Sequence, residues 1–310
     1  MYPICRNTFK QWLKSNKKYE IFYVNLGSPK PFDVTLRDGL QNYKGSISTL
    51  EKLKTYNKIK QLHNPRDIEI GSSVSTKLLP IFNDSNILYN YIGFLHDIKH
   101  GELTNNFIFF PNEKQLLNNF DKFTNLKNIS VVTSTSNSFQ LKNTKMDLDT
   151  TFKQLLNINT FLSNKVNAEH KLKIYISCIN KCPIEGKIAT NKIVDIILLH
   201  LKMNPYNLCL SDTCGTLEPK DFENILYEIK FYSQKPFDNI SLHLHVIPGE
   251  ENKAKELIHL ALYYGITKFD TSLLNTGGCS ITLNESQIVS NLSYELYYKS
   301  LCQYIETYSV

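Results

Sequence analysis

The 310-residue sequence contains no apolar run that approaches the ~20 residues needed to span a bilayer. Its first twenty residues include five basic side chains and a single acid, Glu20, but no apolar core of the kind that a secretion signal carries. We therefore expect a cytoplasmic protein without a membrane partner. The basic start is faintly similar to an organellar transit segment, which is the alternative for the first residues.

Cysteine is also scarce, with seven residues, an odd number and few for this length. Such usage disfavours a disulfide framework and is typical of a reduced intracellular chain. Cys178 and Cys182 lie close together before a proline, but a zinc site would need further paired ligands that the sequence does not offer. We predict that both remain reduced.

A strong charge bias is absent as well. Lys and Arg number 35 and Asp and Glu number 29, which gives a net charge of +6. A nucleic-acid surface would need these cations on one face, whereas the lysines here are scattered among Asn, Ile and Tyr. We expect no nucleic-acid partner, although a CoA phosphate would also suit a mild basic excess.

What the sequence does have, from Pro31 onward, is an alternation of short β-branched or aromatic runs with longer segments of helical period. The runs predicted as strands are 32–36, 67–72, 106–110, 128–134, 173–179, 207–212, 240–246 and 268–274. Eight such units predict an α/β protein with the (β/α)8 TIM-barrel fold. The alternative is a doubly wound open sheet, which usually has a glycine-rich turn after its first strand, and none is present here.

The domain prediction follows from the same alternation. We expect a short amino-terminal extension over residues 1–30 and a TIM-barrel catalytic domain over residues 31–310. Within the extension, the run IFYVNLG at 21–27 is interpreted as a short strand.

Polar residues stand near the carboxyl ends of several predicted strands, and in a barrel these ends meet at one mouth. They include Arg37, Asp38 and Gln41 after the first strand, Glu69 on the second, Asp212 on the sixth, His243 and His245 on the seventh, and Asp270 on the eighth. Because side chains alternate along a strand, His243 and His245 point to the same face. With Asp38 they predict a metal site, while Asp270 by itself is expected in a salt bridge or a strand-end hydrogen bond.

Six segments, in this order, resemble the hydroxymethylglutaryl-CoA lyase family: RDGLQN (37–42), IEIGSSVS (68–75), YISCINKCPIEGKI (175–188), LSDTCGTLEP (210–219), LHLH (242–245) and FDTSLLNTGGCS (269–280). The wider group of metal-dependent barrels also includes the isopropylmalate, homocitrate and citramalate synthases. Leu40 matches the lyase pattern, since the synthases usually have an acid there. Only residues 280–310 follow Cys279, so we expect no regulatory domain of the synthase type.

The resemblance implies a carbon–carbon lyase of the oxo-acid-lyase type that uses Mg²⁺ or Mn²⁺ and an acyl-CoA as its small-molecule partner. The reaction would be a retro-Claisen cleavage of a 3-hydroxy-3-methylglutaryl-CoA-like substrate to acetoacetate and acetyl-CoA. By resemblance, Asp38, His243 and His245 are the metal ligands. Arg37, next to Gln41 in the substrate site, would face the thioester oxygen, where a donor of this kind is typically worth on the order of 10²–10³ in rate.

Three further residues match catalytic positions of the family. Glu69 and Asp212 are implied to orient the metal, its water and the substrate, with Asp212 as a partner in proton transfer. Cys279 is implied to protonate the enolate, which suits a thiol with a reference pKa of about 8.5. A homodimer is left open.

The sequence departs from the family after Cys279, where the family supplies an asparagine that reaches the metal. A direct count places Ile288 there, and Asn284 or Asn291 is the substitute if the loop is rebuilt. Two alternatives to the lyase therefore stay open: a Claisen-condensing acyltransferase of the synthase group, and a catalytically impaired barrel that acts as a binding module. From the residues alone, two histidines and a carboxylate also suit iron or zinc.

Overall fold

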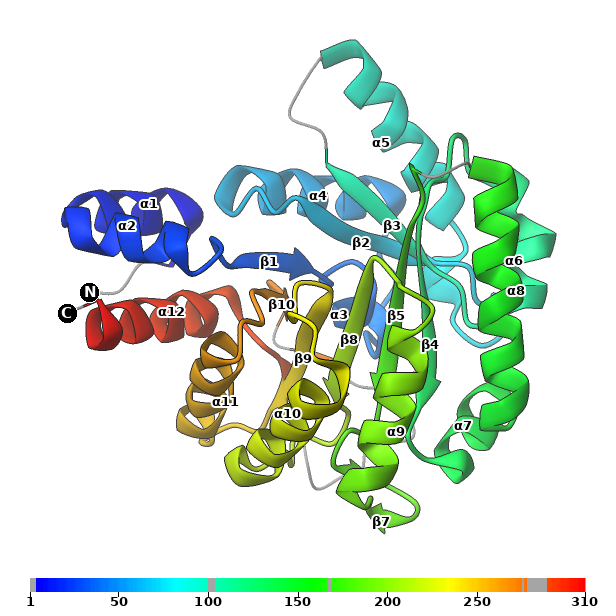
Figure 1. Ribbon diagram of the computed structural model, residues 1–310. Coiled ribbons are helices and arrows are strands. Elements are labelled where there is room, and N and C mark those ends of the chain that lie inside the picture. The colour runs from blue at the N-terminus through cyan, green and yellow to red at the C-terminus, as the bar shows by residue number, and fades with distance from the viewer. Residues whose placement is uncertain (1–3, 100–103, 167–168, 275, 278–288, 310) are drawn as a thin grey trace.

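The computed structural model describes residues 4–99, 104–166, 169–274, 276–277 and 289–309. Its centre is a ring of parallel strands: β1 (Lys30–Asp33), β2 (Asp67–Ser72), β3 (Asn105–Phe109), β4 (Asn128–Ser134), β5 (Lys171–Ser177), β8 (Asn207–Asp212), β9 (Ile240–Val246) and β10 (Lys268–Thr271). Neighbours in this order pair in parallel, and β10 pairs with both β9 and β1, which closes the ring. The predicted (β/α)8 TIM barrel is confirmed (Figure 1).

Helices cover the outside of the barrel: α4 (Thr49–Leu62), α5 (Ser85–Lys99), α6 (Glu113–Asn119), α7 (Asn137–Thr144), α8 (Leu148–Val166), α9 (Thr190–Leu201), α10 (Pro219–Ser233), α11 (Glu251–Tyr263) and α12 (Tyr294–Tyr308). Their inner faces are apolar, as in α10, where Phe222, Ile225, Leu226 and Ile229 are buried. No helix among the described residues is long and apolar enough to cross a membrane.

Shorter elements lie in the connections between the barrel strands and helices. They are α3 (Asp38–Gln41), two 3₁₀ turns at Pro80–Phe82 and Phe120–Lys122, the hairpin strands β6 (Lys181–Cys182) and β7 (Gly186–Lys187), and β11 (Ser290–Asn291). β11 pairs antiparallel with β9 at the carboxyl end of the barrel.

The prediction of a strand at 21–27 is wrong. The chain forms two helices before the barrel, α1 (Arg6–Lys14) and α2 (Lys17–Asn25). The side chain of Asn16 accepts a hydrogen bond from Lys18 N and so caps α2. The aromatic residues of this stretch then contact the barrel at helical spacing, for example Phe22 against Tyr304 of α12 with ring centroids 6.3 Å apart. Packing overrode the strand propensity of the run.

The barrel interior is filled by side chains and includes the buried cation of Lys173. Phe32 and Phe107 pack edge to face at 5.1 Å between ring centroids, with Tyr206 beside them. The Nζ atom of Lys173 lies 3.3 Å from the centre of the Phe32 ring and donates to Asp270 at 2.6 Å. The salt bridge expected for Asp270 is therefore present, and it anchors the interior just below the site.

Candidate functional site

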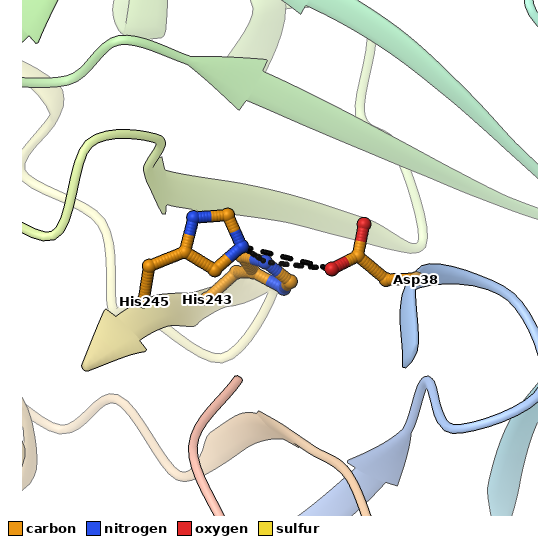
Figure 2. Close-up of side chains that lie close together, drawn as sticks. All are labelled: Asp38, His243 and His245. Carbon is orange, nitrogen blue, oxygen red and sulfur yellow. Dashed lines mark hydrogen bonds and ion pairs between the residues drawn. The ribbon is translucent and has the colours of Figure 1, made fainter. Parts of the chain in front are cut away.

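Asp38, His243 and His245 converge at the carboxyl end of the barrel (Figure 2). The two Nε2 atoms are 3.1 Å apart, and they lie 3.9 Å and 3.6 Å from Oδ2 of Asp38 for His243 and His245 respectively. All three side chains are buried. The strand period of β9 places both imidazoles on one face, and α3, which starts at Asp38, supplies the carboxylate. These three residues form a cluster that could hold a metal ion.

The second nitrogen of each imidazole is already engaged. Nδ1 of His245 is 3.0 Å from the carbonyl oxygen of Thr213, and Nδ1 of His243 is 3.1 Å from Oδ2 of Asp270. A carbonyl only accepts, so Nδ1 of His245 donates and its Nε2 carries a lone pair. Although burial raises the pKa of Asp270, Lys173 and His243 outweigh burial and hold it below its usual value. An ionised Asp270 assigns the same tautomer to His243.

Two imidazole lone pairs and a carboxylate therefore face one another at close range. Burial raises the pKa of Asp38, but Arg37 and the two imidazoles outweigh burial and hold it well below its usual range. Burial also lowers the pKa of His245, yet Asp38 and the Thr213 carbonyl raise it overall. The two imidazole lone pairs and the Asp38 carboxylate repel one another unless a cation lies between them. A divalent metal ion fits this set of donors.

Asn291 lies against the same cluster through the pairing of β11 with β9, in which it is opposite His245. Its Nδ2 donates to Oδ2 of Asp38 at 2.9 Å and to the carbonyl of Thr276 at 3.0 Å. Its Oδ1 is buried and has no hydrogen-bond partner among the described residues, which marks it as a candidate oxygen ligand. Ile288 and Asn284, the other positions considered from the sequence, lie outside the described residues, as does Cys279.

Arg37 connects the cluster to Glu69. Its Nε donates to Oε2 of Glu69, and its Nη1 donates to Oδ1 of Asp38 at 2.7 Å and to Gln41 at 3.5 Å. The guanidinium lies 5.1 Å and 4.9 Å from the ring centres of Phe109 and Tyr175. Burial opposes the charge, but Glu69, Tyr175 and Asp38 hold the pKa of Arg37 well above its usual value.

Glu69 faces Arg37 and not the metal cluster. Besides Arg37 it accepts hydrogen bonds from Ser130 Oγ and, at 3.1 Å, from the hydroxyl of Tyr175. Both carboxylate oxygens are thus occupied by donors from β4, from β5 and from the residue that precedes α3. The geometry suits a residue that fixes the position of the Arg37 guanidinium.

Asp212 lies at the end of β8, where it organises a loop. Its two oxygens each accept a backbone N–H, from Thr216 and from Leu217, both at 3.1 Å. Burial raises its pKa to about 6 in spite of these bonds. The loop begins with Thr213, whose carbonyl sets the tautomer of His245, so Asp212 acts on the cluster through the backbone.

Sequence reasoning missed Lys173 and Tyr175. Both lie on the interior face of β5, where Lys173 holds Asp270 and Tyr175 holds Glu69. A signal was present, because Lys173, Tyr175 and Ser177 are polar residues at every second position of an otherwise apolar strand. Their interaction partners come from β2 and β10, which no local pattern reveals.

A cavity of about 700 Å³ opens over the cluster. Its floor includes Arg37, Asp38, Gln41 and both histidines, and one wall is apolar, with Leu79, Phe82 and Phe139 among its residues. Lys142 and Lys145 line its outer part. A volume of this size is typical of a site for a small organic ligand.

The cysteines predicted as reduced form no disulfide among the described residues. Cys178 and Cys182 are buried, and the thiol of Cys182 lies 3.1 Å from the hydroxyl of Ser136. The only group of metal-ligating side chains in the described chain is the one at Asp38.

Comparison with known proteins agrees with this geometry. A family model described as HMGL-like matches residues 28–280. The human mitochondrial hydroxymethylglutaryl-CoA lyase is 27% identical over 252 residues, which cover 81% of this chain and 72% of that protein. The chicken (Gallus gallus) protein of the same name is 26% identical over 254 residues, covering 81% and 78%.

Solved structures share the fold. The hydroxymethylglutaryl-CoA lyase of Pseudomonas aeruginosa has a TM-score of 0.72 at 21% identity, covering 89% of this chain and 90% of its own. An HMG-CoA lyase from Acinetobacter baumannii, solved in complex with coenzyme A and 3-methylmalate, has a TM-score of 0.73 at 22% identity and 90% coverage of each chain.

Proposed function

The chain belongs to the HMGL-like family of carbon–carbon lyases, and we propose on this basis that it cleaves a 3-hydroxy-3-methylglutaryl-CoA-like thioester to acetoacetate and acetyl-CoA. The observation that carries the proposal is the convergence of Asp38, His243 and His245 on the floor of a cavity that also presents Arg37. Magnesium or manganese is the ion that the resemblance implies.

In this proposal Asp38, His243 and His245 hold the divalent ion, and the orphaned Oδ1 of Asn291 is a further oxygen ligand. A divalent ion bound there would lower the pKa of the substrate hydroxyl and favour its ionised form. The carboxylate and amide oxygens suit magnesium or manganese, which prefer oxygen ligands.

Arg37 stabilises the charge that develops on the thioester oxygen when the carbon–carbon bond breaks. Its guanidinium is permanently charged, and Glu69, Asp38 and two aromatic rings fix its orientation, so no reorganisation is needed during the reaction. Among the described residues its hydrogen bonds use Nε and Nη1, and Nη2 is the donor that we assign to the substrate. Gln41, on the same floor, is assigned to substrate contact.

The remaining roles follow from position. Glu69 and Asp212 are positioning residues, the first for Arg37 and the second for the loop that begins at Thr213. Cleavage leaves an acetyl-CoA enolate that takes up one proton, and Cys279 is the proposed donor by resemblance. The outer lysines of the cavity, Lys142 and Lys145, suit the phosphates of a CoA arm.

The test is an assay of acetoacetate release from 3-hydroxy-3-methylglutaryl-CoA with added Mg²⁺ or Mn²⁺. Product that depends on the metal supports the lyase. Free thiol released from acetyl-CoA only when an α-keto acid is supplied would select the condensing acyltransferase instead. A folded, metal-binding protein without product in either assay would indicate a binding module.

The roles of Arg37 and His243 are separated by comparing two variants. Arg37→Gln is expected to lower turnover by about 10²–10³ while metal binding is largely kept. His243→Ala should lose both turnover and metal binding. A fall in metal affinity for Arg37→Gln as large as that for His243→Ala would contradict the assignment of Arg37 to the substrate.

A further inference from the structure

A second cavity, of about 560 Å³, lies at the end of the barrel away from the metal cluster. Its lining comes from α1, α2, the end of α4 and α12, from residues 28–31 at the start of β1, and from residues 63–66 between α4 and β2. In a barrel of parallel strands, the residues that come just before the strands lie at the amino end. This end is opposite the mouth that the carboxyl ends of the strands form. Figure 1 shows α1 and α2 beside α12 at this end. The proposed lyase chemistry makes no use of this cavity.

The cavity is positively charged. Among the lining residues that the structure describes there are five cations and no carboxylate; the cations are Arg6, Lys10, Lys30, Lys60 and Arg66. Lys60 donates a hydrogen bond to Thr104. No ion pair within the described chain joins Arg6, Lys10, Lys30 or Arg66 to an acid. Such a cavity favours an anionic ligand, and arginine suits phosphate in particular.

Two buried polar groups of the lining residues have no hydrogen-bond partner among the described residues: the hydroxyl of Tyr297 and Nδ1 of His63. These residues are only 1% and 3% exposed. Native proteins rarely leave buried groups of this kind unsatisfied. Burial lowers the pKa of His63 to about 4, so its imidazole is neutral and offers one donor and one acceptor. Both groups point to a ligand with its own hydroxyl groups or oxygen atoms.

The remaining wall is aromatic. The ring of Phe9 lies 5.4 Å from that of Tyr23 and 5.2 Å from that of Tyr298, and all three residues line the cavity. Phe9 and Tyr298 are buried, and the partly exposed ring of Tyr23 is the part of this wall against which a flat heteroaromatic base would pack. We propose that this cavity binds a nucleoside diphosphate, with its base on the aromatic wall, its phosphates among the cations, and its ribose near Tyr297 and His63.

The first experiment measures the binding of ADP to the full chain by calorimetry and compares Lys10→Gln with Lys14→Gln. Both lysines are exposed on α1, but only Lys10 lines the cavity. Loss of a charge-assisted hydrogen bond should weaken ADP binding roughly tenfold in Lys10→Gln. Lys14→Gln should bind ADP as the unmodified chain does. Equal weakening in both variants, or no binding of millimolar ADP by the unmodified chain, overturns the proposal.

Tyr297→Phe tests the buried hydroxyl. Because this hydroxyl has no partner in the described chain, its removal should not lower the melting temperature of the free protein. ADP binding should weaken about fivefold, the worth of an ordinary hydrogen bond. A variant that binds ADP as tightly as the unmodified chain would show that Tyr297 does not contact the nucleotide and would contradict the proposed position.

Two controls separate this cavity from the mouth over the metal cluster. Lys142→Gln, which removes a cation of the mouth, should weaken ADP binding less than Lys10→Gln does. A loss of binding in Lys142→Gln in place of Lys10→Gln would move the nucleotide to the mouth and end the proposal. Inorganic pyrophosphate and adenosine should each bind more weakly than ADP, and pyrophosphate that binds equally well would exclude a contact with the base.

Discussion

The imidazoles of His243 and His245 can serve a cation because each has its other nitrogen occupied. Thr213 and Asp270 accept hydrogen bonds from the two Nδ1 atoms, which leaves both Nε2 lone pairs directed at Asp38. Partners of this kind are commonly worth 10–100-fold in metal affinity. At the scale of single residues, the site therefore depends on groups that never touch the ion.

Asn291 gives the most direct prediction at this scale. Asn291→Ala should weaken the binding of Mn²⁺ by about 10- to 100-fold, because it removes both the candidate oxygen ligand and a hydrogen bond to Asp38. Calorimetric titration with Mn²⁺ measures this effect. Ser290→Ala, the neighbouring change in β11, is the matched control and should bind the ion normally. Equal affinity in Asn291→Ala and the control would exclude Asn291 as a ligand.

Lys173 gives a second prediction at the scale of single residues. Lys173→Met leaves the ionised Asp270 without its fully buried partner and should lower the free energy of unfolding by about 3–5 kcal/mol. Urea unfolding measures the loss. Adding Asp270→Asn to Lys173→Met should recover part of it, because no buried charge is then left unpaired. The absence of any recovery in the double variant would show that the pair itself is not the cause.

At the scale of elements, β11 and residues 276–277 hold Asn291 against the cluster. A side chain at Gly277 would place its Cβ 2.6 Å from Nδ2 of Asn291, closer than real contacts allow. The carbonyl of Gly277 is also fixed, since it accepts a hydrogen bond from Asn42 at 3.1 Å. The absence of a side chain at Gly277 is thus a condition for the position of β11.

Gly277→Ala should consequently displace Asn291 and lower metal affinity with little loss of global stability. Calorimetry with Mn²⁺ and thermal unfolding together measure the two effects. Gly93→Ala is the control, because a Cβ at Gly93 in α5 would meet no atom within 4 Å and alanine favours the helix. If Gly277→Ala binds Mn²⁺ as well as Gly93→Ala does, the close approach to Asn291 has no bearing on the site.

The amino-terminal helices α1 and α2 are also elements with a specific role in the fold. Trp12, Tyr19, Phe22 and Leu26 of α1, α2 and the residue that follows pack against the core, and the ring of Phe9 contacts that of Tyr298 in α12. Phe9, Leu13 and Tyr23 of these helices line the second cavity, which therefore requires both the helices and the barrel.

At the scale of the whole molecule, the barrel separates two charged regions, a metal cluster at the carboxyl ends of the strands and a basic cavity at the amino ends. A buried acid on β1 also couples stability to pH. Asp33 accepts hydrogen bonds from Thr35 and, at 2.8 Å, from the hydroxyl of Tyr294, yet burial raises its pKa to about 7.

The sign of this coupling follows from the raised value. Between about pH 4 and about pH 7 the folded state binds the proton of Asp33 more tightly than the unfolded state does. The contribution of Asp33 to the free energy of unfolding is complete below this pH range. It is lost as the pH rises through the range, by about 1.4 kcal/mol per pH unit. Asp33→Asn cannot titrate, so its stability relative to the unmodified chain should increase from pH 5 to pH 7. Urea unfolding at both pH values measures the difference, and a constant difference would contradict the raised pKa.

The sequence by itself determined the eight strands, the barrel, and the residues of the cluster, because strand and helix periods and the alternation of side chains are local properties of the chain. β2, β4, β8 and β9 begin and end where the pattern placed them. The local rules failed at 21–27, where contacts with α12 decided for a helix.

Only the tertiary structure decided which partners these residues have. A count from Cys279 gave Ile288, with Asn284 or Asn291 as substitutes, and the pairing of β11 with β9 is what brings Asn291 to Asp38. Lys173 finds Asp270, and Glu69 finds Arg37, across gaps of 97 and 32 residues in the chain. A periodic pattern specifies which way a side chain points, but closure of the barrel brings distant strands together, and that closure is a property of the whole chain.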